Sequence, residues 1–191
     1  MKKLLVFIVV FYSIATMKPF AQVASSLSIG SNYLCITDLN FGYGLGTTPV
    51  VNAEFSKYYV GITCINGFRV LFNNRFQDDF GFSLGNSIFA GIGTGVSVYN
   101  GGILVPLFVD IRYWFSVRGF APYLYYDAGL LINPKELNAG TRMFVEGGAG
   151  ISYTLYNKLA INATSGLLIQ MGNAKPRDAF AKLSLGASFR F

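Results

Sequence analysis

The last twelve residues of the chain, FAKLSLGASFRF, alternate between apolar and polar positions. From Ala181 to Phe191 the odd-numbered residues are apolar, and the residues between them are polar, charged or glycine. This period of two predicts a β-strand with one apolar face and one polar face. The sequence predicts no amphipathic helix that could cover the apolar face. The pattern therefore favours a barrel wall whose apolar face meets lipid and whose polar face lines a lumen.

Alternating segments recur along the chain and predict seven strands before this last one, at 180–191. They are expected at residues 33–46, 50–70, 86–99, 103–116, 120–133, 141–155 and 158–171. The alternation loses its phase near Asn66 and Gly67, which predicts a β-bulge there. Residues 71–85 have no regular pattern, and we expect a long turn. The predicted extracellular loops are short and lie at residues 47–49, 100–102, 134–140 and 172–179.

These elements predict an all-β fold, an eight-stranded antiparallel up-and-down transmembrane β-barrel. A tilted strand of ~9 to 11 residues is long enough to cross a bilayer. An even number of strands places both ends of the barrel on one side, which is periplasmic in outer-membrane barrels. A soluble β-sandwich or lipocalin-like barrel also alternates, but it turns its apolar face inward and carries many Lys and Glu outside. The polar face here is mainly Gly, Ser, Thr and Asn, which suits a narrow lumen.

The composition is too apolar for an ordinary soluble domain. Hydrophobic residues make up 52% of the 191 residues and charged residues 13%, whereas about a quarter of a soluble domain is charged. Lys2 and Lys3 precede an apolar run that is too short to span a bilayer. This start predicts a secretory signal peptide at residues 1–21. We expect a lead-in segment at 22–32 and the outer-membrane β-barrel domain at 33–191.

The charged and reactive residues exclude several classes of function. The net charge is +6, and it falls to +3 without the signal peptide, which holds three lysines and no acid. This small and dispersed excess predicts no nucleic-acid partner. The chain contains no histidine, so a Ser-His-Asp relay cannot be assembled. We therefore expect no enzymatic activity and no cofactor.

The two cysteines, Cys35 and Cys64, form no CxxC motif, so the sequence predicts neither a metal site nor a disulfide scaffold. Both are expected on outward faces of adjacent strands, and a hairpin centred on Pro49 would bring them level. An exported chain can oxidise such a pair, but neighbouring strands often fail the geometry of a disulfide. Free thiols and a disulfide both stay open at this point.

Charged residues recur on the faces predicted to line the lumen. The expected lumen ion network, with Asp38 and Arg69 as further candidates, comprises Asp110, Arg112, Asp127, Arg142, Glu146, Lys182 and Arg190. Buried ions persist when they are paired, so we expect a compensated structural network that fills the lumen. Asp110 and Arg112 are two residues apart on one strand and are its expected centre. A narrow gated conduction path or a catalytic acid is the alternative role.

Glycines and aromatic residues also have expected structural roles. The glycines at positions 91, 93 and 95 are expected to relieve crowding inside the barrel. Interfacial girdles, near strand ends or on the outward face, are expected to contain Tyr113, Phe115, Tyr126, Tyr153 and Tyr156.

Several segments resemble the core signature of a known family. Residues 105–115 read VPLFVDIRYWF, and Ala121-Pro122-Tyr123 and Asp127-Ala128-Gly129 follow them. With the glycine-rich residues 90–95 and the terminal Phe191, they resemble small Gram-negative outer-membrane β-barrel proteins of the OmpA-barrel and OmpX type, within the porin-like outer-membrane barrels. The resemblance covers most of the chain after the lead-in segment.

The resemblance implies a place in the cell outer membrane, as part of the cell envelope. The implied partners are outer-membrane lipid and lipopolysaccharide, and during assembly the barrel-insertion machinery and periplasmic chaperones. In that family the insertion machinery reads a C-terminal aromatic residue on an alternating strand. By resemblance, this implies an assembly signal at Leu185, Phe189 and Phe191.

These expectations predict an integral outer-membrane β-barrel protein with a filled lumen and a structural or surface-interaction role. One alternative is a narrow porin-like channel for ions or small solutes. The other is an exported soluble β-barrel that binds an apolar ligand.

Overall fold

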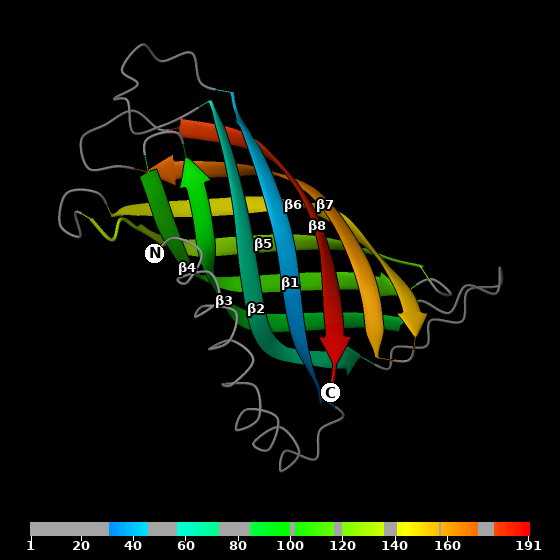
Figure 1. Ribbon diagram of the computed structural model, residues 1–191. Helices are drawn as coiled ribbons and strands as arrows, with labels where there is room; N and C mark the ends of the chain where they lie inside the picture. Colours follow the sequence, from blue (N-terminus) through cyan, green and yellow to red (C-terminus); the bar gives the residue numbers. More distant parts are fainter. Residues whose placement is uncertain are drawn as a thin grey trace.

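Each strand pairs with its sequence neighbours, and β8 pairs with β1 to close a barrel (Figure 1). The computed structural model describes residues 31–45, 57–72, 85–99, 102–116, 120–135, 141–156, 158–171 and 178–191. The strands are β1 (Ser31–Gly44), β2 (Tyr58–Phe72), β3 (Gly85–Tyr99), β4 (Gly102–Ser116), β5 (Phe120–Ile132), β6 (Arg142–Tyr156), β7 (Leu159–Met171) and β8 (Asp178–Arg190). All pairings are antiparallel, which confirms the predicted eight-stranded up-and-down barrel.

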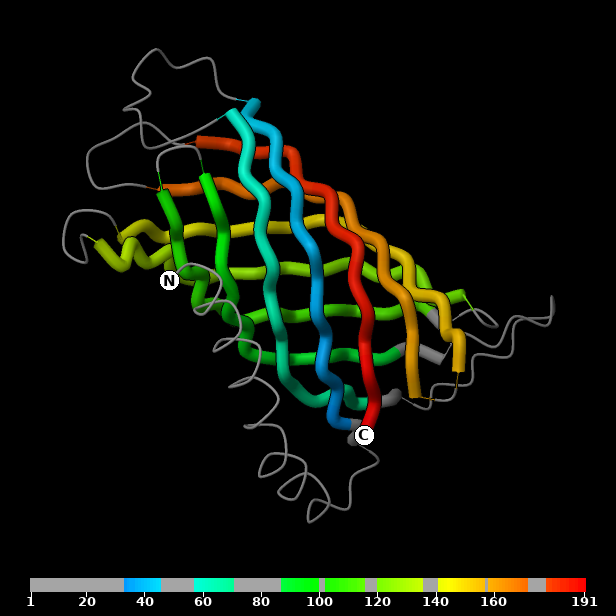
Figure 2. The backbone as a smooth tube through the Cα atoms, viewed as in Figure 1, coloured from blue at the N-terminus to red at the C-terminus, as the bar shows by residue number. Residues whose placement is uncertain are grey.

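The closure joins the first strand to the last. Figure 2 shows β1 between β2 and β8, and Tyr43 lies opposite Tyr58 on one side and Ala181 on the other. Beyond the end of β8, the Phe191 N–H donates to the backbone oxygen of Tyr33 at 3.1 Å. A closed sheet leaves no strand edge unpaired. In the described part of the chain, no helix is long and apolar enough to cross a membrane.

The strand boundaries agree with the prediction within two residues, except at the start of β2. The expected start at residue 50 is wrong, because β2 begins at Tyr58, opposite Tyr43, close to the end of β1. The lead-in is shorter than expected, since β1 begins at Ser31. The signal peptide, the rest of the lead-in, the turn at 47–49 and residues 73–84 of the expected long turn lie outside the described residues.

The predicted bulge at Asn66 and Gly67 is also wrong. The register of β2 with β1 and β3 continues without a shift through both residues. Asn66 keeps its outward position, where its side-chain oxygen accepts a hydrogen bond from the Tyr33 hydroxyl at 3.1 Å. Within the described strands a register shift occurs instead at the end of β6, between Thr154 and Tyr156.

The two cysteines lie on adjacent strands as expected, but they are not level. Cys35 faces Asn66 and Cys64 faces Thr37, so the cysteines are diagonal neighbours. The register differs by two residues from the one that a hairpin centred on Pro49 would give, so the expected level position of the two cysteines is wrong. Cys35 and Cys64 are not joined by a disulfide, and their Sγ atoms lie in hydrogen-bond contact, 3.8 Å apart.

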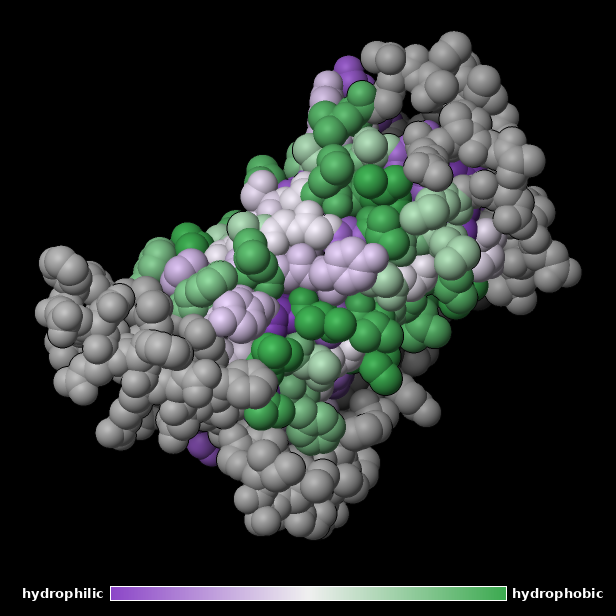
Figure 3. Space-filling view, turned by 180° about the vertical axis from the view of Figure 1, so that it is seen from behind, coloured by the Kyte–Doolittle hydropathy of each residue, from purple (hydrophilic) through white to green (hydrophobic). Residues whose placement is uncertain are grey.

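Large apolar side chains cover the outer wall. Figure 3 shows hydrophobic residues spread across the barrel face turned to the viewer. Leu39, Ile92 and Leu185 are 61%, 65% and 65% exposed, although they lie well within their strands. The alternation places the charged residues of the described strands in the inward set. The outward direction of the apolar residues is therefore confirmed.

Aromatic residues gather on the outer wall near both ends of the barrel. Tyr43 and Tyr58 lie at one end, with ring centroids 5.5 Å apart. Tyr113 and Phe115 lie near the other end, at 4.8 Å. This arrangement is typical of interfacial girdles. Tyr126 is outward and exposed too, but it lies at the middle of β5 rather than at an end.

Aromatic rings fill the lumen near the end at which β1 begins and β8 ends. Trp114 packs edge-on against Phe89, with ring centroids 5.9 Å apart, and lies tilted against Tyr123 at 5.2 Å. The Arg69 guanidinium lies 4.8 Å from the centre of the Trp114 ring and covers it. This end of the lumen is packed with side chains.

A second aromatic group fills the opposite end of the lumen. Tyr59 stacks on Tyr99 with ring centroids 5.1 Å apart, and Phe180 meets Tyr59 edge-on at 5.6 Å. Phe108 and Phe144 belong to the same group and pack against each other with ring centroids 5.8 Å apart. A narrow polar layer remains between the two aromatic groups.

Inward glycines leave room for these large rings. A Cβ atom on Gly93 would overlap the Phe108 ring, and one on Gly91 would lie 2.6 Å from Phe89. Gly150 faces Tyr123 in the same way, at 2.5 Å. This confirms the expectation that the glycines relieve crowding inside the barrel.

Candidate functional site

The centre of the lumen holds a buried arginine clamped by two carboxylates. The Arg112 Nε donates to both oxygens of Asp110 at 3.0 and 2.9 Å, and its Nη2 donates to Asp38 Oδ2 at 3.2 Å. Its Nη1 donates to the Tyr123 hydroxyl at 3.4 Å. Arg112 is 2% exposed. The planar guanidinium suits this task because it presents several donors in a fixed geometry.

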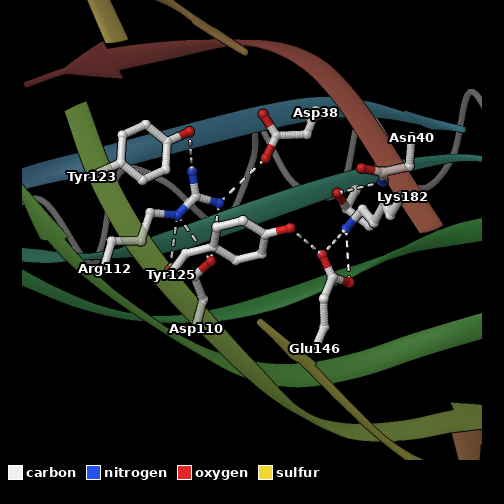
Figure 4. A network of polar contacts seen from close by, with 9 residues as sticks. Asp38, Asn40, Asp110, Arg112, Tyr123, Tyr125, Glu146 and Lys182 are labelled. Carbon is white, nitrogen blue, oxygen red and sulfur yellow. Dashed lines mark hydrogen bonds and ion pairs between the residues drawn. The ribbon is translucent and has the colours of Figure 1, made fainter. Parts of the chain in front are cut away.

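A second ion pair lies beside this clamp (Figure 4). The Lys182 ammonium is 2.7 and 2.9 Å from the two carboxylate oxygens of Glu146. The Tyr125 hydroxyl donates to the same carboxylate at 2.8 Å. The centre of the Tyr125 ring also lies 5.9 Å from the Arg112 guanidinium. Tyr125 therefore lies between the two ion groups and contacts both of them. We call the polar residues between the two aromatic groups the central layer. It comprises Asp38, Asp110, Arg112, Tyr123, Tyr125, Asp127, Glu146 and Lys182.

The strand register brings the central layer together. Asp110 on β4 lies opposite Asp127 on β5, which in turn lies opposite Glu146 on β6. The lumen is narrow enough for Arg112 on β4 to reach Asp38 on β1, 74 residues away in sequence. The alternation points all of these side chains inward. Gly186 leaves space for the Asp38 carboxylate, where a Cβ atom would collide with it.

Asp127 differs from the other carboxylates of the central layer. Asp38, Asp110 and Glu146 each have an ion-pair partner, whereas Asp127 has none among the described residues. Its Oδ1 atom is buried without a hydrogen-bond partner. A cavity of about 20 Å³ adjoins it, with Asn40 also in its lining. A cavity of this size has room for about one water molecule.

The structure does not place all seven predicted network residues in the central layer. Arg142 lies at the end of the lumen with the second aromatic group, where it pairs with Asp178 at 3.3 Å. Arg190 is exposed in the last position of β8, so the structure does not place it among the buried ions of the central layer. Being at the strand end leaves it in contact with solvent at the rim. The other five, Asp110, Arg112, Asp127, Glu146 and Lys182, lie in the central layer.

Several residues of the site were missed by the predicted network. Tyr123 and Tyr125 hydrogen-bond to Arg112 and Glu146, and the signal for them was their shared phase with Asp127 on one strand. Asn40 donates to Thr63 Oγ1 at 2.9 Å inside the same lumen. Asp178 is the first residue of β8 but lies within residues 172–179, which were expected to form a loop, so no lumen position was predicted for it.

The chemistry that this site supports is limited. In the described strands and loops, no group of three or more His, Cys, Asp or Glu residues could hold a metal ion. The cationic groups Arg112 and Lys182 are both engaged by carboxylates. The arrangement can hold the walls of the barrel together across the lumen and keep the lumen filled.

Comparison with known proteins places the chain by its fold. The sequence matches no protein-family model and no curated protein. The structure is similar to the crystal structure of Neisserial surface protein A, NspA, with a TM-score of 0.56 and 12% identity over 85% of this chain and 97% of that chain. The two chains share a fold.

Two other solved structures are more distant. A de novo designed transmembrane β-barrel has 17% identity over 83% of this chain and 95% of that chain, with a TM-score of 0.41. The Yersinia pestis outer membrane protein Ail has 15% identity over 82% and 99%, with a TM-score of 0.38. These scores are too low to add to the comparison with NspA.

Proposed function

We propose that the chain is an integral outer-membrane β-barrel protein with a filled lumen and a structural or surface-interaction role. The observation that carries the proposal is the contrast between an apolar outer wall and an interior filled by ion pairs and aromatic rings. Lipid is the solvent that suits such an outer wall. The fold shared with NspA supports the same proposal.

The filled lumen argues against the channel alternative. Aromatic groups pack on both sides of the central layer, around Trp114 at one end and Tyr59 at the other. A cavity of about 20 Å³ lies between Asp127 and the second aromatic group, and it is far smaller than a water-filled pore. The soluble alternative requires apolar residues around an interior ligand site, but Leu39 and Leu185 point outward.

Two measurements test the proposal. The detergent-folded protein, run on a denaturing gel without boiling, is expected to migrate faster than the boiled sample and to resist protease. In planar bilayers it is expected to give no conductance steps, while a large porin measured under the same conditions gives them. A protein that stays in the aqueous phase without detergent would contradict the membrane proposal. Regular conductance steps would support the channel instead.

The C-terminal strand has the features of an assembly signal. Leu185, Phe189 and Phe191 are all exposed on the outside of β8 or just after it. The Phe191 ring lies 5.0 Å from that of Phe189 and 5.7 Å from that of Tyr33, which fixes its position beside the first strand. We propose that the barrel-insertion machinery reads these three residues.

Deletion of Phe191 tests the assembly role. The variant is expected to accumulate in the outer membrane at a lower level than the wild type, measured by fractionation and immunoblotting. Replacing Phe191 with Tyr keeps an aromatic residue and serves as the control, with a level close to wild type. Normal outer-membrane levels of the deletion variant would exclude Phe191 from the signal.

A further inference from the structure

The central layer contains more negative than positive charge. Its two cations are both paired; Arg112 is buried and the Lys182 side chain is 11% exposed. Its four carboxylates belong to Asp38, Asp110, Asp127 and Glu146. If all of them are ionised, two negative charges lie in a closed lumen without compensation. Uncompensated buried charge is costly, so the layer favours any ligand that brings positive charge.

The excess is concentrated at Asp127. Its cross-strand neighbours are Asp110 on one side and Glu146 on the other. Directly opposed side chains have Cβ atoms about 4.5–5.5 Å apart, and like charges at such positions destabilise a sheet. Arg112 compensates Asp110, and Lys182 compensates Glu146. Asp127 therefore experiences repulsion from both sides and lacks a cation of its own among the described residues.

The adjoining cavity offers oxygen atoms without partners. Asp127 Oδ1, Asn40 Oδ1 and the Tyr59 hydroxyl are buried and without a hydrogen bond, and all three residues line the cavity. Each of these residues is 3% exposed. A carboxylate oxygen and an amide oxygen can only accept hydrogen bonds. The cavity thus requires a ligand that donates hydrogen bonds or carries positive charge, and it has room for about one atom the size of water oxygen.

We propose that the central layer binds one further positive charge at Asp127, either as a proton on its carboxyl group or as a monovalent cation in the adjoining cavity. Both forms neutralise Asp127 and remove its repulsion with Asp110 and Glu146. One positive charge neutralises Asp127, the one carboxylate of the layer without an ion pair in the described strands, and the remaining negative charge is shared by Asp38 and Asp110 around Arg112. The inference rests on the proposed function, because a closed lumen keeps the layer out of bulk water.

Other groups face Asp127 and belong to any account of its pH dependence. Asp110 and Glu146 lie opposite it on β4 and β6, and Tyr59, Tyr99, Glu146 and Lys182 line the same cavity. The other titratable and charged side chains of the central layer are Asp38 on β1, Arg112 on β4, and Tyr123 and Tyr125 on β5. Among these, Asp127 alone is a carboxylate without an ion pair in the described strands. Replacing the Asp127 carboxylate with an amide therefore tests this position without changing the other groups.

A bound proton and a bound cation make the stability of the barrel depend on different variables. If the folded barrel binds a proton that the unfolded chain releases, stability falls as pH rises through the range in which the folded barrel loses it. One such proton changes the unfolding equilibrium constant by up to about tenfold per pH unit. If the charge is a cation, stability rises with the concentration of that cation at constant pH. The two forms can therefore be separated.

The test compares Asp127→Asn with the wild-type protein and with Asp178→Asn as a matched control. Urea unfolding in detergent is followed by the fluorescence of Trp114, the single tryptophan of the chain, over a pH series. Each series is run in sodium chloride and in N-methylglucamine chloride, whose cation is too large for the cavity. Heat-modifiability on a gel confirms that each protein is a folded barrel before the comparison.

The wild type and Asp178→Asn are expected to lose stability with rising pH, or to be more stable in sodium than in N-methylglucamine. Asp127→Asn is expected to lose the part of either dependence that comes from Asp127, because its amide is neutral and of similar size. A wild type without either dependence, or an Asp127→Asn variant with an unchanged one, overturns the inference. If the wild type does not form a folded barrel in detergent, the proposed outer-membrane function is contradicted rather than this inference.

A second measurement covers the case in which Asp127→Asn does not fold. The infrared spectrum of the wild type is expected to show the C=O band of a protonated carboxyl group, shifted in D₂O, if the charge is a proton. In the absence of this band, a sodium-dependent gain in wild-type stability identifies a cation. The absence of both signals overturns the inference without any variant.

Discussion

The inner and outer faces of the wall are made by the same strands under different requirements. On β5, Asp127 faces the central layer, while the next residue, Ala128, points outward. Inside, each large side chain meets particular atoms, such as Tyr125 with the Glu146 carboxylate. Outside, Leu39 and its neighbours need only be apolar. The inner face is therefore specified by geometry and the outer face by solvent.

The inner contacts also connect strands that the sheet does not pair. Arg112 joins β4 to β1, and Lys182 on β8 joins Glu146 on β6. Near one end, Gln170 on β7 donates to the Tyr99 hydroxyl on β3 at 2.9 Å. Such contacts across the lumen form only when the barrel is closed in the correct register. We infer that they favour the native closure over barrels with shifted strands.

Removal of the Arg112 side chain is expected to have the largest effect on this inner face. Arg112→Ala leaves two buried carboxylates, Asp110 and Asp38, without their cation. Breaking a buried ion pair in this way costs about 3–5 kcal/mol. Urea unfolding in detergent, followed by Trp114 fluorescence, measures the loss.

A conservative variant sharpens this prediction. Arg112→Lys keeps the charge but loses the planar donors that reach Asp110 and Asp38 together, so it is expected to be intermediate in stability. A loss below about 1 kcal/mol for Arg112→Ala, the range of exposed ion pairs, would show that the central layer contributes little to the fold.

Adjacent glycines provide a direct comparison of the two faces. A Cβ atom on the inward Gly148 would lie 2.8 Å from the Tyr125 ring and would overlap the backbone of β7. On the outward Gly147 it would meet nothing nearer than 3.8 Å. Gly148→Ala is expected to cost about 1–3 kcal/mol, as overpacking does.

Gly147→Ala is the matched control for that change. It is expected to leave stability unchanged or to raise it by about 0.5–1 kcal/mol, because alanine has less conformational freedom to lose than glycine. Both variants are measured by the same urea unfolding. Equal effects at the two positions would contradict the difference between the faces.

A charge on the outer wall should affect stability through lipid alone. Leu185 is 65% exposed near the middle of β8. Leu185→Asp is expected to cost about 1–2 kcal/mol in a bilayer, less than the value for Lys or Arg at the midplane. It should also lower the amount of protein assembled in the outer membrane. Leu185→Ala, which stays apolar, is the control. If fractionation finds the two variants at equal levels in the outer membrane, Leu185 does not face lipid.

The alternation determines which face a residue lies on, but not which residue it meets. Shifting a strand by one residue reverses its faces, whereas shifting it by two preserves them. The sequence therefore predicted that Asp110 and Arg112 point inward, and it misplaced Cys35 relative to Cys64 by two residues. The contact of Arg112 with Asp38 depends on the register of several strands around the barrel. No local pattern contains that information.

The ion pair between Arg142 and Asp178, at the end of the lumen, tests how far along the lumen an ion pair contributes strongly to stability. Arg142 and Asp178 join β6 to β8 at 3.3 Å, but Asp178 is 28% exposed, so water screens the pair. Exposed pairs contribute about 0.2–1 kcal/mol, and we expect a coupling energy in this range from the cycle of Arg142→Ala, Asp178→Ala and the double variant. High salt should reduce it. A coupling energy as large as the loss for Arg112→Ala would mean that the low-dielectric interior extends to the rim of the barrel.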